Sequence, residues 1–109
     1  PQKATQLFEK LLHSYPGDFE IQINYNESFL WAKKYLKAEP LYADLVAKYP
    51  TNFGAVLGYA NTLSNLKEYE SAVEWVAKAL SLEPNNASAK NSRKYMRLGY
   101  ANQRVTNQE

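Results

Sequence analysis

The side chains that could do chemistry are few and scattered in this chain. His13 is the only histidine among the 109 residues, and there is no cysteine. Because a metal site or a nucleophile–base pair needs several such groups together, His13 assembles neither. Glu70 and Glu74 form an i,i+4 carboxylate pair, which is more typical of a solvated helix face than of catalytic acids. With no phosphate-binding glycine loop either, the sequence predicts a non-enzymatic protein without a metal or cofactor.

Charge is unevenly distributed along the chain, although the net charge at pH 7 is only +2. Residues 1–84 hold eight basic and ten acidic residues, whereas residues 85–109 hold five basic residues and one acidic residue. Four of these basic residues recur at helical spacing, namely Lys90, Arg93, Lys94 and Arg97. Nucleic-acid binding would need more aromatic side chains among them than Tyr95 and Tyr100. The pattern favours a solubilising polar face that ends a helical array, leaves contact with an acidic partner domain open, and argues against nucleic acid.

An internal repeat determines which elements position these side chains. Phe19, Tyr25, Tyr35, Ala38 and Pro50 recur at one fixed spacing as Phe53, Tyr59, Tyr69, Ala72 and Pro84. A fixed period of about 34 residues is typical of a helical solenoid, in which no single unit can bury its apolar face alone. The repeat predicts a protein that works through a surface rather than through a catalytic pocket.

Apolar spacing and helix-breaking residues predict six helices. The helices are expected to cover about residues 4–14, 19–32, 35–48, 53–65, 69–82 and 87–99. Residues 100–109 form a polar tail that is expected to fray. Because the loops have only two to four residues, successive helices must be antiparallel. The predicted fold is all-α, built from stacked antiparallel helix pairs.

Residues 53–84 resemble a tetratricopeptide repeat, the helix–turn–helix unit of a large family of helical solenoids. Ala60, Ala72 and Ala79 stand where that family places small residues at the helix crossing, and Pro84 ends the second helix. The resemblance implies a right-handed superhelical solenoid of antiparallel helix pairs.

The resemblance extends over residues 1–99 with less regular units. Residues 19–50 form a second repeat in which Asn26 and Leu45 replace two small residues, which implies wider packing or a buried partner for the asparagine. Residues 1–16 resemble only the second helix of a unit, and residues 87–99 resemble only a first helix.

In the tetratricopeptide family the first helices of the pairs line a concave groove. The resemblance implies that the groove residues here are Asn24, Glu27, Trp31, Leu57, Asn61, Asn65 and Tyr95. The asparagines are suited to bond the backbone of an extended peptide, and Trp31 and Tyr95 to pack on its side chains. The alternative is that all seven are ordinary surface residues. Gly54 and Gly58 either form a notch for a ligand side chain or reflect close helix packing or simple sequence drift, and we favour the second interpretation.

Some members of the family hold the C-terminal carboxylate of heat-shock chaperones with lysine, arginine and asparagine side chains. The matching positions here are Ile23, Glu27, Gly58, Ser88 and Ser92. None carries a positive charge, and Glu27 would repel a carboxylate. We therefore do not expect binding of chaperone tails.

The predicted function is a non-enzymatic scaffold that binds a peptide or a partner protein through the groove, within a longer protein. Two alternatives stay open. Such repeats also resemble regions that precede outer-membrane barrels in bacteria, where they would serve polysaccharide export or assembly, and the chain could instead be a structural spacer or self-association segment. The compartment stays open between the cytoplasm and the bacterial periplasm or outer membrane. No apolar run approaches the ~20 residues that span a bilayer.

The first predicted helix has an apolar face without a partner in the repeat pattern. Its residues Leu7, Phe8 and Leu11 are expected to be incompletely covered. Exposed apolar patches usually mark contacts. We therefore expect either homo-association through this helix or a further helix before Pro1.

Overall fold

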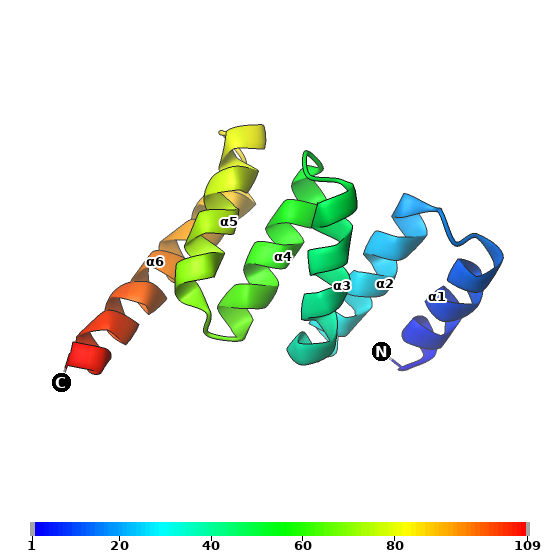
Figure 1. The fold of residues 1–109 in the computed structure, drawn as a ribbon, viewed down its shortest axis with the longest axis horizontal. Helices are drawn as coiled ribbons and strands as arrows, with labels where there is room; N and C mark the ends of the chain where they lie inside the picture. The colour runs from blue at the N-terminus through cyan, green and yellow to red at the C-terminus, as the bar shows by residue number, and fades with distance from the viewer. Residues whose placement is uncertain (1, 109) are drawn as a thin grey trace.

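The computed structural model describes residues 2–108, and within this range it contains six helices and no strand (Figure 1). The helices are α1 (Gln2–Ser14), α2 (Phe19–Trp31), α3 (Tyr35–Lys48), α4 (Phe53–Asn65), α5 (Tyr69–Leu82) and α6 (Ala87–Gln108). Successive helices run antiparallel in a row that measures 51 × 28 × 22 Å. The predicted all-α solenoid of helix pairs is confirmed. No helix in residues 2–108 is long and apolar enough to cross a membrane.

The helices form two layers. Helix α4 contacts both α2 and α6, so these three helices make one continuous inner layer. Among the described residues, α1, α3 and α5 make no close backbone contact with one another, and each packs on helices of the inner layer instead. The turns between α2 and α3 and between α4 and α5 lie on the same edge of the row, the lower edge in Figure 1.

Asparagine or aspartate side chains start each inner-layer helix. The Ile21 N–H donates to Asp18 Oδ1 at 3.1 Å, the Ala55 N–H to Asn52 Oδ1 at 2.9 Å, and the Ala89 N–H to Asn86 Oδ1 at 3.0 Å. Each cap supplies an acceptor for a backbone donor that the first helical turn leaves free. The three caps recur at the repeat period, so the same local chemistry sets the register of the inner layer.

The core is centred on small residues at the helix crossings. Ala38, Ala60, Ala72 and Ala79 are fully buried, and larger side chains such as Tyr42, Val76 and Met96 fill the space around them. Because the alanine side chains are small, the helix backbones can approach each other closely. The small-residue positions implied by the repeat are therefore confirmed.

Enlarging Ala72 should overpack this crossing. We expect Ala72→Leu to lower the free energy of unfolding by about 1–3 kcal/mol, measured by urea denaturation. The matched control is Ser71→Leu, because Ser71 is exposed on the same helix turn. Equal stability of the two variants would contradict close packing at this crossing.

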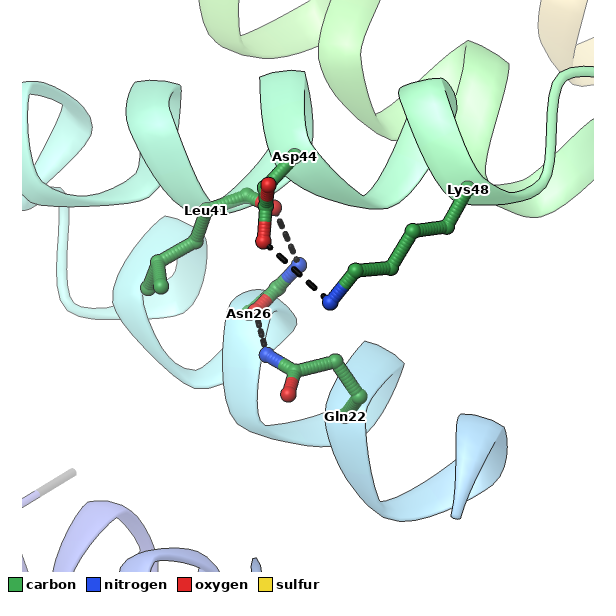
Figure 2. Close-up of polar contacts among 5 residues, drawn as sticks. All are labelled: Gln22, Asn26, Leu41, Asp44 and Lys48. Atoms are coloured by element: carbon green, nitrogen blue, oxygen red, sulfur yellow. Dashed lines mark hydrogen bonds and ion pairs between the residues drawn. The ribbon is translucent and has the colours of Figure 1, made fainter. Parts of the chain in front are cut away.

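Asn26 needs a buried partner, and the structure confirms that expectation. Its side chain is fully buried on α2, where Gln22 Nε2 donates to Asn26 Oδ1 at 2.9 Å and Asn26 Nδ2 donates to the Leu41 carbonyl of α3 at 3.2 Å (Figure 2). The amide therefore links α2 to α3 with its donor and acceptor both engaged. Figure 2 also shows the ion pair between Lys48 and Asp44 on α3. Lys48 Nζ lies 3.4 Å from Asp44 Oδ2, and because both side chains are exposed, the pair adds little stability.

The last helix is longer than the sequence predicts. The expected end at residue 99 and the fraying tail are wrong, because α6 continues to Gln108. Gly99 faces α5 so closely that an added Cβ would lie 2.5 Å from Tyr69 Cε1. Beyond it, Gln103 Nε2 donates to the Lys67 carbonyl at 2.8 Å. Gly99 thus allows a close helix contact rather than ending the helix, and Glu109 lies outside the described residues.

Candidate functional site

The predicted groove residues lie on the three helices of the inner layer, but Trp31, the last residue of α2, lines a different surface from the other six. Asn24 is exposed and Glu27 is half-buried on α2. Helix α4 carries half-buried Leu57 and Asn61 and exposed Asn65, and α6 carries exposed Tyr95. Leu57 packs against both core clusters, which fixes it at the base of this face. We call these six residues the inner face.

Two asparagine amides of the inner face are available to a ligand. The side chains of Asn24 and Asn61 make no hydrogen bond to any other residue in the range 2–108. Asn65 differs, because its Nδ2 donates to the Asn61 carbonyl at 2.8 Å. Asn24 and Asn61 each offer a donor and an acceptor, which suits the backbone of an extended peptide.

Glu27 gives the inner face a negative charge without a partner. Burial raises the pKa of the Glu27 carboxyl above its usual range. The one ion pair within residues 2–108 joins Lys48 and Asp44, so no basic side chain there compensates Glu27. A nearby cation stabilises the charged form of such a partly desolvated carboxylate, and a nearby anion destabilises it.

The glycines of α4 mark close helix packing, as the sequence favours. A Cβ added to Gly58 would lie 2.3 Å from Tyr42 Cε1, because the buried Tyr42 ring of α3 occupies that space. A Cβ at Gly54 would lie 3.3 Å from Ile23 Cδ1 of α2. The space beside Gly58 is filled by the protein, so no ligand notch exists there.

The comparisons with known proteins agree with this arrangement. Residues 29–93 match the sequence model of the tetratricopeptide repeat family. The chain belongs to the tetratricopeptide repeat family. Domains of this family are protein-interaction scaffolds, and the general role of this chain is protein binding. No curated protein sequence matches the chain.

Several solved structures share the fold. The first tetratricopeptide domain of human RPAP3 superimposes with a TM-score of 0.87 at 22% identity, covering 95% of this chain and 82% of that one. The first domain of Spaghetti (RPAP3) bound to the HSP90 peptide SRMEEVD gives 0.84 at 23% identity, covering 92% and 79%. A MamA D159K mutant gives 0.74 at 23% identity, covering 87% of this chain but 52% of that one. This chain thus spans about half the length of the MamA chain, and at these identities the likeness shows the fold alone.

Trp31 is the predicted groove residue that the structure places elsewhere in this tetratricopeptide domain. Its side chain is 75% exposed at the end of α2. It lines an open cleft of 1070 Å³ between α1 and α3, and none of the six inner-face residues lines that cleft. The same cleft is lined by Lys33, Lys34, Leu36 and Lys37, which the sequence prediction did not single out. A position-by-position comparison of the two repeats would have found them.

The two ends of the domain differ in chemistry. Leu7 is 56% exposed, and Phe8 and Leu11 are half-buried, because α1 packs only on α2 within the described residues. Homo-association through this face stays a prediction. On α6, Lys90, Lys94 and Arg97 are exposed and Arg93 is half-buried, so most of the basic residues predicted to form a polar end face are in contact with solvent. No group of three His, Cys, Asp or Glu side chains in residues 2–108 is arranged to hold a metal ion.

Proposed function

We propose that this tetratricopeptide domain is a non-enzymatic module that binds an extended peptide of a partner protein along its inner face, and that it prefers a peptide with a basic residue. The observation that carries the proposal is the combination of the unpaired Glu27 carboxylate with the unbonded amides of Asn24 and Asn61. The charge of Glu27 supplies the preference, and the two amides supply backbone recognition.

Peptide backbone is the ligand class that these amides fit. An extended segment presents N–H and C=O groups that need partners, and an asparagine side chain offers one acceptor and two donors. Leu57 and Tyr95 add apolar contact area on the adjacent helices. The similar domain of Spaghetti (RPAP3) is bound to the peptide SRMEEVD, which supports a peptide as the ligand class.

An acidic peptide such as SRMEEVD is not the ligand proposed for the inner face. Burial already disfavours the charged form of Glu27, so a second carboxylate nearby would add repulsion. A lysine or arginine side chain would instead pair with it and offset its desolvation. The inner face is therefore proposed to select basic or neutral peptides.

The experiment is selection from a displayed library of random peptides, followed by affinity measurement on the selected sequences. We expect the selection to yield a class of peptides enriched in lysine or arginine, and Glu27→Gln to weaken the binding of that class about fivefold, the equivalent of ~1 kcal/mol for a partly exposed charge pair. Asn61→Ala should weaken them as well. Glu70→Gln is the matched control, because Glu70 is an exposed carboxylate on the outer helix α5.

Three results would contradict the proposal. Tight binding of SRMEEVD that Asn61→Ala weakens would show that the inner face accepts an acidic peptide despite Glu27. Basic peptides whose affinity changes with neither Glu27→Gln nor Asn61→Ala would bind somewhere other than the inner face. A library that yields no binder would favour the alternative of a structural spacer.

A further inference from the structure

The two turns on the lower edge of the row have the same backbone. We call residues 31–37 the first corner and residues 65–71 the second corner. Lys33 has φ 59° and Lys67 has φ 65°, the left-handed conformation that closes a helix. The Lys34 N–H donates to the Phe29 carbonyl at 2.8 Å, and the Glu68 N–H donates to the Leu63 carbonyl at 2.9 Å. The left-handed conformation and the backbone hydrogen bonds of the turn are thus equivalent at the two corners.

The side chains of the two corners differ in kind. Trp31, Lys34, Leu36 and Lys37 of the first corner correspond, one repeat period later, to Asn65, Glu68, Glu70 and Ser71. Trp31 is 75% exposed and Leu36 is 78% exposed. Since the second corner forms the same turn with polar and acidic residues, the fold does not require tryptophan, leucine or lysine at these positions.

Exposed apolar side chains of this size add little to folding. Hydrophobic stabilisation scales with the apolar area removed from water, and Trp31 and Leu36 leave most of theirs in water. Clustered exposed apolar groups usually mark an interaction site. Their presence in one corner and not in its structural equivalent points to binding.

The first corner borders a cleft that can accept side chains. The cleft between α1 and α3 has a volume of 1070 Å³, and half-buried or buried Tyr25, Phe29 and Leu41 supply apolar surface within it. On the opposite wall, Glu9 Oε1 accepts a hydrogen bond from the Tyr25 hydroxyl at 3.3 Å, so that carboxylate is already engaged. The cleft thus offers apolar surface beside polar groups, and residues of the first corner form part of its lining.

The charge of the first corner is positive and uncompensated. Lys33, Lys34 and Lys37 line the cleft, and none of them forms an ion pair within residues 2–108. The charged groups that line the cleft are these three lysines and Glu9. A ligand with carboxylates would therefore meet an excess of positive charge beside apolar surface.

We propose that the first corner and its cleft bind a short acidic segment of a partner protein that carries aromatic or aliphatic side chains. The apolar side chains enter the cleft beside Trp31 and Leu36, and the carboxylates pair with Lys34 and Lys37. This site lies apart from the inner face, prefers the opposite charge, and does not depend on the proposed function. A flat lipid surface would contact the tips of Trp31 and Leu36 but would not fill the recess between α1 and α3.

The chain itself supplies the test variant. In the corner-swap variant, Trp31→Asn, Lys34→Glu, Leu36→Glu and Lys37→Ser give the first corner the residues of the second. All four positions are exposed, so we expect an unchanged helical circular dichroism spectrum. Peptides selected from the random library on the native chain should include a class rich in aspartate or glutamate with phenylalanine, tryptophan or leucine. The corner-swap variant should bind that class at least about tenfold more weakly.

Two controls separate this site from others. Glu68→Gln combined with Glu70→Gln changes the charge of the second corner and should leave the acidic peptides bound. Glu27→Gln on the inner face should leave them bound as well, although it weakens the basic class. If Glu27→Gln abolished the binding of the acidic peptides, these peptides would bind on the inner face, and the inference would be overturned. Should the corner-swap variant fail to fold, Lys34→Gln with Lys37→Gln tests the charge contribution alone.

Comparing the native chain with the corner-swap variant would also detect other ligands of the first corner. One such result is that the native chain binds vesicles of equal parts phosphatidylserine and phosphatidylcholine while the corner-swap variant does not. If the selection also yielded no acidic peptides, these results would assign the corner to lipid and refute the proposal. Concentration-dependent association in sedimentation that the corner swap abolishes would assign it to a second copy, through the acidic second corner. Acidic peptides that bind the corner-swap variant unchanged would also refute it.

Discussion

Replacing Tyr42 with alanine is expected to lower the free energy of unfolding by about 3–5 kcal/mol, the range for truncating a buried aromatic side chain. Tyr42 is 1% exposed and is among the largest fully buried side chains of the protein. Its ring extends from α3 to α4, so the variant would lose apolar burial and leave a cavity between the two helices. Urea denaturation followed by the helical circular dichroism signal measures the loss.

The effect of Gly58→Ala on the free energy of unfolding should change sign between the native background and the Tyr42→Ala background. In the native background, Gly58→Ala places a Cβ against the Tyr42 ring and should cost about 1–3 kcal/mol. In the Tyr42→Ala background that ring is absent, so the same change should stabilise the protein by up to about 1 kcal/mol through better helix propensity. A double-mutant cycle measures the coupling.

Gly17→Ala is the control for this cycle, because an added Cβ at Gly17 meets no atom within 4 Å. Its effect should be the same in both backgrounds. Additive effects of Gly58→Ala and Tyr42→Ala would show that the Tyr42 ring does not determine the glycine at position 58.

Replacing Asn26 with aspartate should destabilise the protein by about 3 kcal/mol or more at pH 7. The two side chains have nearly the same shape, but a charged carboxylate at this fully buried position cannot donate to the Leu41 carbonyl and would repel it. Burial disfavours the charged form, so the folded-state pKa of the new carboxyl rises above its unfolded value. The destabilisation is therefore present above the folded-state pKa and disappears as the pH falls below the unfolded value.

Unfolding at pH 7 and pH 4 tests this sign, with Asn26→Ala as the matched control. Alanine is the residue that the next repeat carries at this position, Ala60, and we expect it to cost about 1 kcal/mol at either pH. The difference in the free energy of unfolding between Asn26→Asp and Asn26→Ala should become smaller at pH 4, because the protonated carboxyl can again donate a hydrogen bond to the Leu41 carbonyl. A difference independent of pH would show that the charge is not the cause.

The sequence by itself determined the helices and their pairing. Phe19 and Phe53, or Ala38 and Ala72, recur at one period, and the prolines and short loops that separate helices act on neighbouring residues only. The asparagine at position 26 also indicated its need for a buried partner, because a polar group at a small-residue crossing must be satisfied. These inferences succeed because secondary structure and capping depend on local spacing and local hydrogen bonds.

Only the tertiary structure decided which residues meet across helices. Gly99 has the local character of a helix end, yet α6 passes through it, because the missing side chain makes room for Tyr69 of α5. Gln103 reaches the Lys67 carbonyl, 36 residues away in sequence. Trp31 falls on the face that the repeat assigns to the groove, yet it borders the cleft between α1 and α3. The shape of that cleft depends on how three helices pack, and such long-range packing leaves no signal in local spacing.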